Sequence, residues 1–231
     1  MTQVAAVLWD LDGTLIDSEP AWLAAARAVA AEHRQELGDA ALQGLVGLTA
    51  RAMGEVLADA GVPLDPEVCA RELSARVAAE HTSGVTWRPG ARELLHDLAA
   101  AGVPQALVTM SGPGLVAPVL DVLPAKTFAV VVTVDDVARP KPAPDAYVLA
   151  ADRLGVDVAR CVAVDDSAPG VAAAVASGAA TVAVPLHTPV AAAGAAALWP
   201  DLTGRGLADI AALLDPSPVP STAPRAVPTE V

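Results

Sequence analysis

Two aspartates separated by a single residue are the first feature of the sequence that could do chemistry. Asp10 and Asp12 follow an apolar run, residues 4–9, that is short and typical of a buried strand. Because side chains alternate along a strand, both carboxylates leave its end on the same side, and Gly13 can turn the chain away from them. Two like charges so close are unfavourable unless a cation lies between them or one carries a proton. The pattern indicates a reactive site, although calcium loops and plain turns also contain it.

The secondary-structure elements that must position this pair are predicted by the hydrophobic pattern of the sequence after residue 86. Short, near-continuous apolar runs alternate there with helical patterns, which is typical of a parallel sheet covered on both faces. We therefore expect an α/β fold with a doubly wound, Rossmann-like parallel sheet. Later strands are expected at 103–108, 128–132, 161–164 and 181–184, and helices at 91–101, 112–120, 143–154, 168–177 and 207–214.

The segment between the first strand and this alternation, residues 17–86, is expected to be helical throughout. Alanine, leucine and charged residues recur in it at helical spacing, and Ser18 is a candidate cap for its first helix. The sequence thus predicts a core made of residues 1–16 and 87–214 that carries an inserted all-helical domain. Residues 215–231 are rich in Pro, Ser and Thr and are predicted to be a disordered tail.

The carboxyl ends of the predicted strands collect further polar side chains, and ligands of such sheets bind beyond these ends. Each side chain alone also has a plainer role, such as a turn, a helix cap or a solvated surface charge. Another acidic pair, Asp135 and Asp136, is expected to be solvated loop charge. The residues that we expect to converge with Asp10 and Asp12 are Thr109 and Ser111, Lys141, and Asp165 and Asp166.

Four motifs in this set resemble, in order and spacing, those of the haloacid dehalogenase superfamily, whose members are mostly Mg²⁺-dependent phosphotransferases. The resemblance covers roughly residues 4–214. Met110, Pro140 and Asp165 stand where many members have Asn, Gly and Glu or Gly. The matching stretches are Asp10-Leu-Asp12-Gly-Thr14-Leu, Ala106-Leu-Val-Thr109, Lys141-Pro-Ala-Pro-Asp145 and Val164-Asp165-Asp166-Ser167.

This resemblance implies a role for each matching residue. Asp10 would attack phosphorus and become an aspartyl phosphate, and Asp12 would act as general acid and base. Mg²⁺ prefers a few carboxylates, and Asp166 is the stronger ligand candidate because Asp165 is shorter than the usual Glu. The implied catalytic residues are Asp10, Asp12, Thr109 and Lys141, and the implied metal ligands are Asp10, Asp12 (through its carbonyl), Asp165 and Asp166.

An insertion directly after the first motif is similar to the helical cap of one subgroup, which includes sugar-phosphate phosphatases and β-phosphoglucomutases. Dehalogenases lack the second acid, and phosphonatases need a cap lysine, which residues 17–86 do not contain. We therefore expect a Mg²⁺-dependent phosphatase of a small phosphate monoester, with a sugar-phosphate mutase as the alternative. A phosphate-binding module without activity would not need Asp12. Ser111 and Arg51 are candidate substrate contacts, although Arg51 and His81 are equally compatible with surface roles.

Composition limits the partners. The 231-residue chain has a formal net charge of -13, so nucleic acid and anionic membranes are unfavourable partners for its surface. Residues 167–199 carry no Asp, Glu, Lys or Arg, but Gly and Pro interrupt them, which argues against a membrane span. Cys69 and Cys161 are expected to be free thiols, and the amino terminus has no signal-peptide pattern. We expect a cytoplasmic monomer whose partner is a small phosphorylated metabolite.

Overall fold

Short runs of Ala, Val and Leu form a single parallel sheet in the computed structural model, which describes residues 4–190 and 194–214. The strand order is β3-β2-β1-β4-β5-β6, and every neighbouring pair is parallel. The order reverses at β1, which lies between β2 and β4, so the predicted doubly wound α/β fold is confirmed. The strands are β1 (Ala6–Trp9), β2 (Gln105–Val108), β3 (Val130–Val132), β4 (Cys161–Asp165), β5 (Ala180–Ala183) and β6 (Ala197–Leu198).

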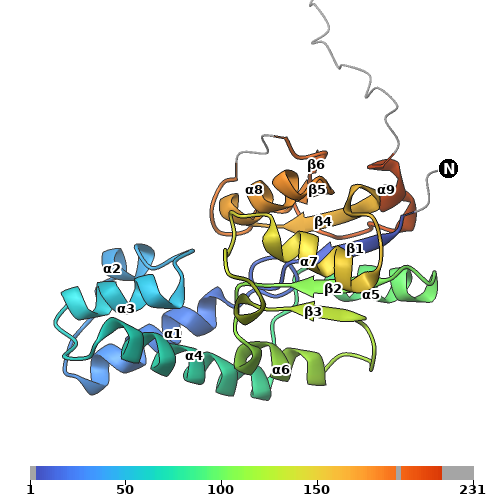
Figure 1. Ribbon diagram of the computed structural model, residues 1–231. Coiled ribbons are helices and arrows are strands. Elements are labelled where there is room, and N and C mark those ends of the chain that lie inside the picture. Colours follow the sequence, from blue (N-terminus) through green and yellow to red (C-terminus); the bar gives the residue numbers. More distant parts are fainter. Residues whose placement is uncertain (1–3, 191–193, 215–231) are drawn as a thin grey trace, which may run out of the picture.

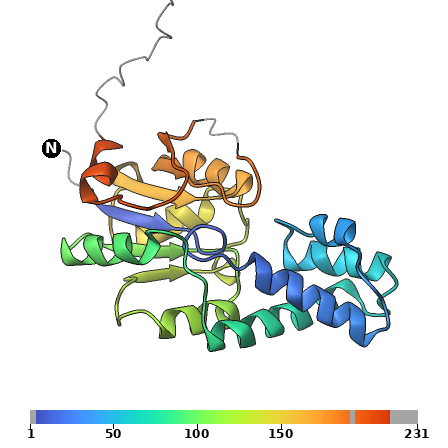
Figure 2. The same ribbon diagram turned by 180° about the vertical axis from the view of Figure 1, so that it is seen from behind.

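Helices cover both faces of the sheet (Figures 1 and 2), which explains why its strands are apolar throughout. One face carries α7 (Asp145–Leu154) and α8 (Ala168–Ser177). The other face carries α5 (Ala91–Ala100), α6 (Pro113–Asp121) and α9 (Leu207–Ala212). The central strands β1, β2 and β4 therefore bury their alternate side chains in two different clusters.

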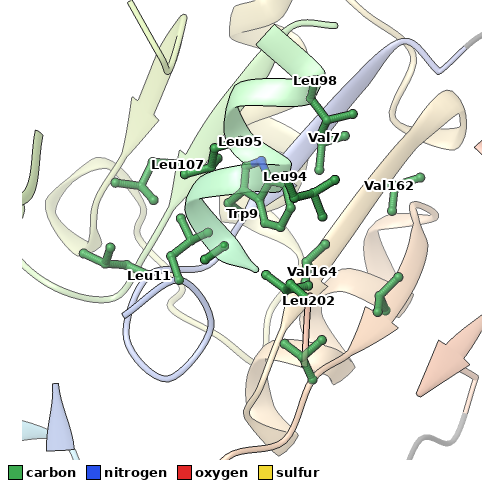
Figure 3. Packing of buried hydrophobic residues seen from close by; sticks show 14 of the residues in the cluster. Val7, Trp9, Leu11, Leu94, Leu95, Leu98, Leu107, Val162, Val164 and Leu202 are labelled. Carbon is green, nitrogen blue, oxygen red and sulfur yellow. The ribbon is translucent and has the colours of Figure 1, made fainter. Parts of the chain in front are cut away.

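Strand β1 shows this division most clearly. Ala6 and Leu8 pack towards α7 and α8, whereas Val7 and Trp9 pack against the leucines of α5 (Figure 3). The indole nitrogen of Trp9 donates to Gln105 Oε1 at 2.9 Å, and this satisfies the polar group of a fully buried side chain. The carboxyl end of β1, which carries the first aspartate pair, is thus anchored on both sides of the sheet.

The insertion forms a helical cap with a hydrophobic cluster of its own. It consists of α1 (Glu19–Glu32), α2 (Asp39–Gln43), α3 (Ala50–Asp59) and α4 (Pro66–Ser83). Its two connections to the core pair with each other, because Ile16 and Trp87 form an antiparallel bridge. The arrows of the core strands point towards the side on which the cap lies (Figure 1), so the cap faces the carboxyl ends of the strands.

Several local expectations need correction. Strand β2 begins at Gln105 rather than residue 103, since Pro104 has no N–H to pair. Strand β6 was not predicted; it has only two residues. Asp136 is not simply solvated charge: it accepts hydrogen bonds from Thr133 and pairs with Arg153 at 2.7 Å. Both cysteines are free, as predicted. The predicted disordered tail lies outside the described residues.

Among the helices of the described residues, none combines the length and apolar character needed to cross a bilayer.

A buried arginine joins the first turn of the core to its far edge. The Arg88 guanidinium donates to the carbonyl of Gly13 and to those of Val184 (2.9 Å) and Pro200 (3.2 Å). Two residues later the chain turns at Gly90, whose φ is +79°. A Cβ at Gly90 would lie 2.2 Å from the backbone of Leu202, so this turn requires glycine for close approach as well as for its dihedral angle.

The first prediction tests this close approach. Gly155 has a similar φ of +71° but would place its Cβ in open space, so it is the matched control. We expect Gly155→Ala to lower the free energy of unfolding by about 1–2 kcal/mol and Gly90→Ala by about 3 kcal/mol or more. Denaturant unfolding of both variants measures the difference. Equal losses would contradict the contact with Leu202.

Candidate active site

The carboxyl ends of β1, β2 and β4 place the predicted polar residues together, on both sides of the point where the strand order reverses. Asp10 and Asp12 follow β1, Thr109 and Ser111 follow β2, and β4 ends at Asp165 with Asp166 next to it. Lys141 enters from the loop before α7 and reaches residues of β1, β2 and β4 at once. Arg51 is the predicted site residue for which no contact with this group is found among the described residues.

Lys141 is the electrostatic centre of the group. Its ammonium donates to Asp10 Oδ1 at 2.7 Å, to Asp165 Oδ2 at 2.8 Å and to the Val108 carbonyl at 3.0 Å, which accounts for all three protons. The side chain is only 4% exposed. Burial alone would lower the pKa of Lys141, but the two carboxylates raise it above its ordinary value, so the ammonium stays charged.

Asp165 is enclosed completely. Its Oδ2 accepts from Lys141 and from the hydroxyl of Tyr147 at 2.6 Å, and its Oδ1 accepts from the backbone N–H and the hydroxyl of Ser167. A Cβ on Gly170 would lie 2.0 Å from either oxygen, so this glycine leaves the space that the carboxylate fills. Because both oxygens are already used by protein donors, Asp165 is better suited to holding Lys141 than to binding a metal directly.

Asp12 is held by two hydroxyl groups from different segments. Ser18 Oγ donates to Oδ1 and Ser111 Oγ donates to Oδ2, each at 2.6 Å. Ser18 occupies the N-cap position of α1, as predicted, but its hydroxyl donates to Asp12 and makes no cap hydrogen bond. Ser111, which was expected to contact substrate, likewise contacts Asp12. The two hydrogen bonds therefore fix the orientation of the Asp12 carboxylate.

Asp166 lies beside Thr14, whose hydroxyl donates to its Oδ1 at 3.1 Å. Burial, followed by the charge of Asp165, raises the pKa of Asp166 to about 7. Burial also raises the pKa of Asp10 well above its usual range; Asp165 and Asp166 act in the same direction, whereas Lys141 opposes it. The group accordingly holds more negative charge than one lysine can balance.

A divalent cation fits this group. Oxygens of Asp10, Asp165 and Asp166 lie within 4.8 Å of one another, and hard cations prefer carboxylate oxygens. Asp10 and Asp166 are the better ligand candidates, since the oxygens of Asp165 are engaged. Gly13 turns with φ +84° next to Asp166, and a Cβ there would lie 2.0 Å from Asp166 Oδ2. The turn after β1 thus approaches Asp166 closely at Gly13.

The remaining predicted residues have other surroundings. The Thr109 hydroxyl is buried and accepts the Ser111 N–H at 3.0 Å, which turns the chain after β2. Arg51 is exposed on α3 and pairs with Glu55 and Glu67, so its charge is used within the cap. His81 is not on the surface: it is buried, 4% exposed, with Nδ1 3.5 Å from the Leu115 carbonyl where α4 meets α6.

Sequence reasoning missed two contributors to the site. Tyr147 is the chain's only tyrosine, and it falls on the apolar face of a predicted helix. A hydroxyl-bearing ring two residues after Asp145, in a chain with 3% aromatic residues, was the available signal. Nothing in the sequence indicated the role of Arg88, because its hydrogen-bond partners are backbone carbonyls of distant segments.

Comparison with known proteins gives a consistent result. A sequence model of the haloacid dehalogenase-like hydrolases matches residues 4–178. Hexitol phosphatase A of Escherichia coli is 38% identical over 189 residues, which is 79% of this chain and 84% of that protein.

Two solved structures share the fold over most of their length. CbbY from Rhodobacter sphaeroides, crystallised with phosphate, has a TM-score of 0.78 and 28% identity, with 90% of this chain and 99% of that one covered. A Thermotoga maritima protein assigned as a β-phosphoglucomutase has a TM-score of 0.72 and 27% identity, with 84% and 93% covered.

The second prediction concerns the cation. We expect Mg²⁺ to raise the unfolding temperature of the chelator-treated protein, because a ligand that binds only the folded state stabilises it, by about 2.7 kcal/mol at a hundred times its dissociation constant. Asp166→Asn should remove most of this shift, since it replaces a carboxylate ligand. Asp59→Asn, an exposed aspartate on α3, is the control and should keep the full shift. An unchanged shift in Asp166→Asn would refute the assignment.

Proposed function

Because the chain belongs to the haloacid dehalogenase-like hydrolases, we propose that it hydrolyses a small phosphate monoester in two steps at Asp10. The chain is a phosphoric monoester hydrolase. The observation that supports the two-step route best is the arrangement of two aspartates with different surroundings at one strand end. Asp10 is buried and held by a lysine, as a nucleophile should be, and Asp12 is held by hydroxyls, as a proton carrier should be.

In the first step, Asp10 attacks phosphorus and the bond to the leaving oxygen breaks. Lys141 opposes the rise in the pKa of Asp10 and orients its carboxylate, and its positive charge would offset part of the negative charge of the phosphoryl group. Asp12 gives its proton to the leaving alkoxide. Asp10 and Asp166, with the Asp12 carbonyl, would hold Mg²⁺, which when bound supplies positive charge that attracts and polarises the phosphoryl oxygens.

In the second step, Asp12 takes a proton from a water molecule, and this water attacks the phosphorus of the aspartyl phosphate. Phosphate leaves and the Asp10 carboxylate is restored. Ser18 and Ser111 keep Asp12 pointed in one direction through both steps, which is the positioning that general acid–base catalysis requires. The cap lies on the side of the carboxyl ends of the strands (Figure 1), where it would limit the access of bulk water to the site.

The substrate that we propose is a sugar phosphate or a similar small metabolite. Hexitol phosphatase A, a relative, is named for a sugar-alcohol phosphate, and the CbbY structure contains phosphate. The β-phosphoglucomutase likeness favours a second candidate, in which the sugar returns and takes the phosphate from Asp10. The expectations of a monomer and of a cytoplasmic location stay predictions.

The third prediction separates the two aspartates. Asp10→Asn should abolish turnover and the phosphoenzyme, because the amide cannot attack phosphorus. Asp12→Asn should keep the attack geometry but slow turnover by roughly 10²–10⁴-fold, since both proton transfers lose their carrier. Phosphate release and mass spectrometry of acid-quenched enzyme measure the two effects. Asp135→Asn, an exposed aspartate, is the control, and near-normal turnover by Asp10→Asn would overturn the proposal.

The fourth prediction sets hydrolysis against transfer. Arg51, the cap residue that was the candidate substrate contact, is paired with Glu55 and Glu67, so its hold on a departing sugar is expected to be weak. We therefore expect β-glucose 1-phosphate with a bisphosphate primer to yield little glucose 6-phosphate, and free phosphate from some monoester to dominate. A coupled dehydrogenase assay and phosphate release give the ratio. Efficient isomerisation with negligible release would identify a mutase and leave Asp10 as the nucleophile.

A further inference from the structure

A seam between cap and core lies next to Asp12. Three segments meet there: the start of α1 at Glu19, the α2–α3 loop at Gly47, and the loop after β5 at His187 and Thr188. Glu19 accepts a hydrogen bond from the Gly47 N–H at 3.3 Å. A Cβ on Gly47 would lie 3.6 Å from the Thr188 methyl group, so the α2–α3 loop also approaches the core loop. Figures 1 and 2 both show this cap loop extending towards the core.

Glu19 has one carboxylate oxygen without a partner. Oε2 is used by Gly47, whereas Oε1 is buried and has no hydrogen-bond partner among the described residues. A buried, unpaired carboxylate oxygen is unfavourable in a folded protein, and such groups are commonly satisfied by a ligand or by ordered water. At this position, close to the proton carrier Asp12, the missing partner is a hydrogen-bond donor.

The charges at the seam restrict what that donor can be. The groups whose charges act on Glu19 are His187, Asp17 and Asp12, so two of the three are acids. The single cationic candidate, His187, lies 2.8 Å from Asp17 and is already engaged. A leaving group that carries a carboxylate or a second phosphate would therefore meet like charge at the seam, where the part of the chain that the structure describes offers no unpaired cation. A neutral hydroxyl would meet an acceptor.

We propose that Glu19 determines specificity by accepting a hydrogen bond from a hydroxyl of the leaving group through Oε1. The preferred substrates are then phosphate monoesters of neutral polyols or sugars, and monoesters whose leaving group is itself an anion are disfavoured. This inference rests on the proposed phosphatase function. It assigns the phosphoryl group to the core residues and the leaving group to the seam.

The experiment compares three kinds of probe. A hexitol 6-phosphate and a hexose 6-phosphate carry neutral hydroxyls, phosphoglycolate carries a carboxylate, and p-nitrophenyl phosphate carries neither. The variants are Glu19→Ala, which removes the acceptor, and Glu19→Gln, which keeps an acceptor and removes the charge. Glu80→Ala, an exposed glutamate on α4 of the same cap, is the matched control. KM and kcat are measured for each pair with Mg²⁺ present.

For the wild type, we expect at least one polyol probe to have a higher kcat/KM than phosphoglycolate. Glu19→Ala should raise KM for the polyol probes by about 10–100-fold, the range for a hydrogen bond to a charged group, and leave p-nitrophenyl phosphate nearly unchanged. Glu19→Gln should lose less on polyols and should improve phosphoglycolate relative to them, because the repelling charge is gone. Glu80→Ala should match the wild type.

Three results would overturn the inference while leaving the phosphatase function intact. One is a wild type that prefers phosphoglycolate, or that hydrolyses p-nitrophenyl phosphate but neither polyol probe. Another is an equal loss on every probe in Glu19→Ala, which would mean that Glu19 only fastens the Gly47 loop. The third is an unchanged KM for polyols. If the wild type hydrolysed no probe at all, the proposed function itself would fail, and the inference with it.

Discussion

The contact between one buried ammonium and two carboxylates is the interaction on which the site depends. Lys141 holds Asp10 and Asp165 together, and it opposes the rise in the pKa of Asp10 that burial and the neighbouring carboxylates cause. The strand order makes this contact possible, because β1 and β4 are neighbours and their carboxyl ends coincide. Tyr147 and Ser167 then occupy the oxygens that Lys141 leaves on Asp165, and the missing Cβ of Gly170 gives that carboxylate its space.

The division of labour follows from the two parts of the fold. The core supplies the charged groups that a phosphoryl group needs, and it is anchored by the buried pair of Trp9 and Gln105. The connection to the cap supplies neighbouring side chains with different tasks: Ser18 directs Asp12, and Glu19 turns to the cap loop. Two consecutive residues at the connection between core and cap thus contact the proton carrier and the cap loop.

The hydrophobic pattern of the sequence predicted the sheet and the convergence of the motifs. An apolar strand and the polar residues at its end are consecutive in the sequence, so both can be recognised there. The pattern could not predict contacts that depend on where distant segments meet. Tyr147 with Asp165 and Arg88 with Gly13 are set by tertiary packing, and Ser18 matched a cap pattern while its hydroxyl had a better acceptor nearby. Strand β6 was not predicted because two residues are too few to show a hydrophobic periodicity. The structure gives no support for Arg51 as a substrate contact. Its side chain pairs with Glu55 and Glu67, and the contact with Glu67 depends on how α3 and α4 pack, which the sequence does not show.

The charge of the group also orders the events at the site. Asp10, Asp165 and Asp166 carry three negative charges when ionised, and Lys141 carries one positive charge, which leaves an excess of two. A phosphate monoester brings up to two more, so its approach to this group alone would be strongly opposed. Burial, followed by the charge of Asp165, raises the pKa of Asp166 to about 7. A divalent cation at Asp10 and Asp166 would offset this excess and leave the carboxylate of Asp12 free to exchange protons. We therefore expect phosphate to bind this group better once a cation is bound, and Asp165, whose oxygens are engaged by Lys141, Tyr147 and Ser167, would not compete for that cation.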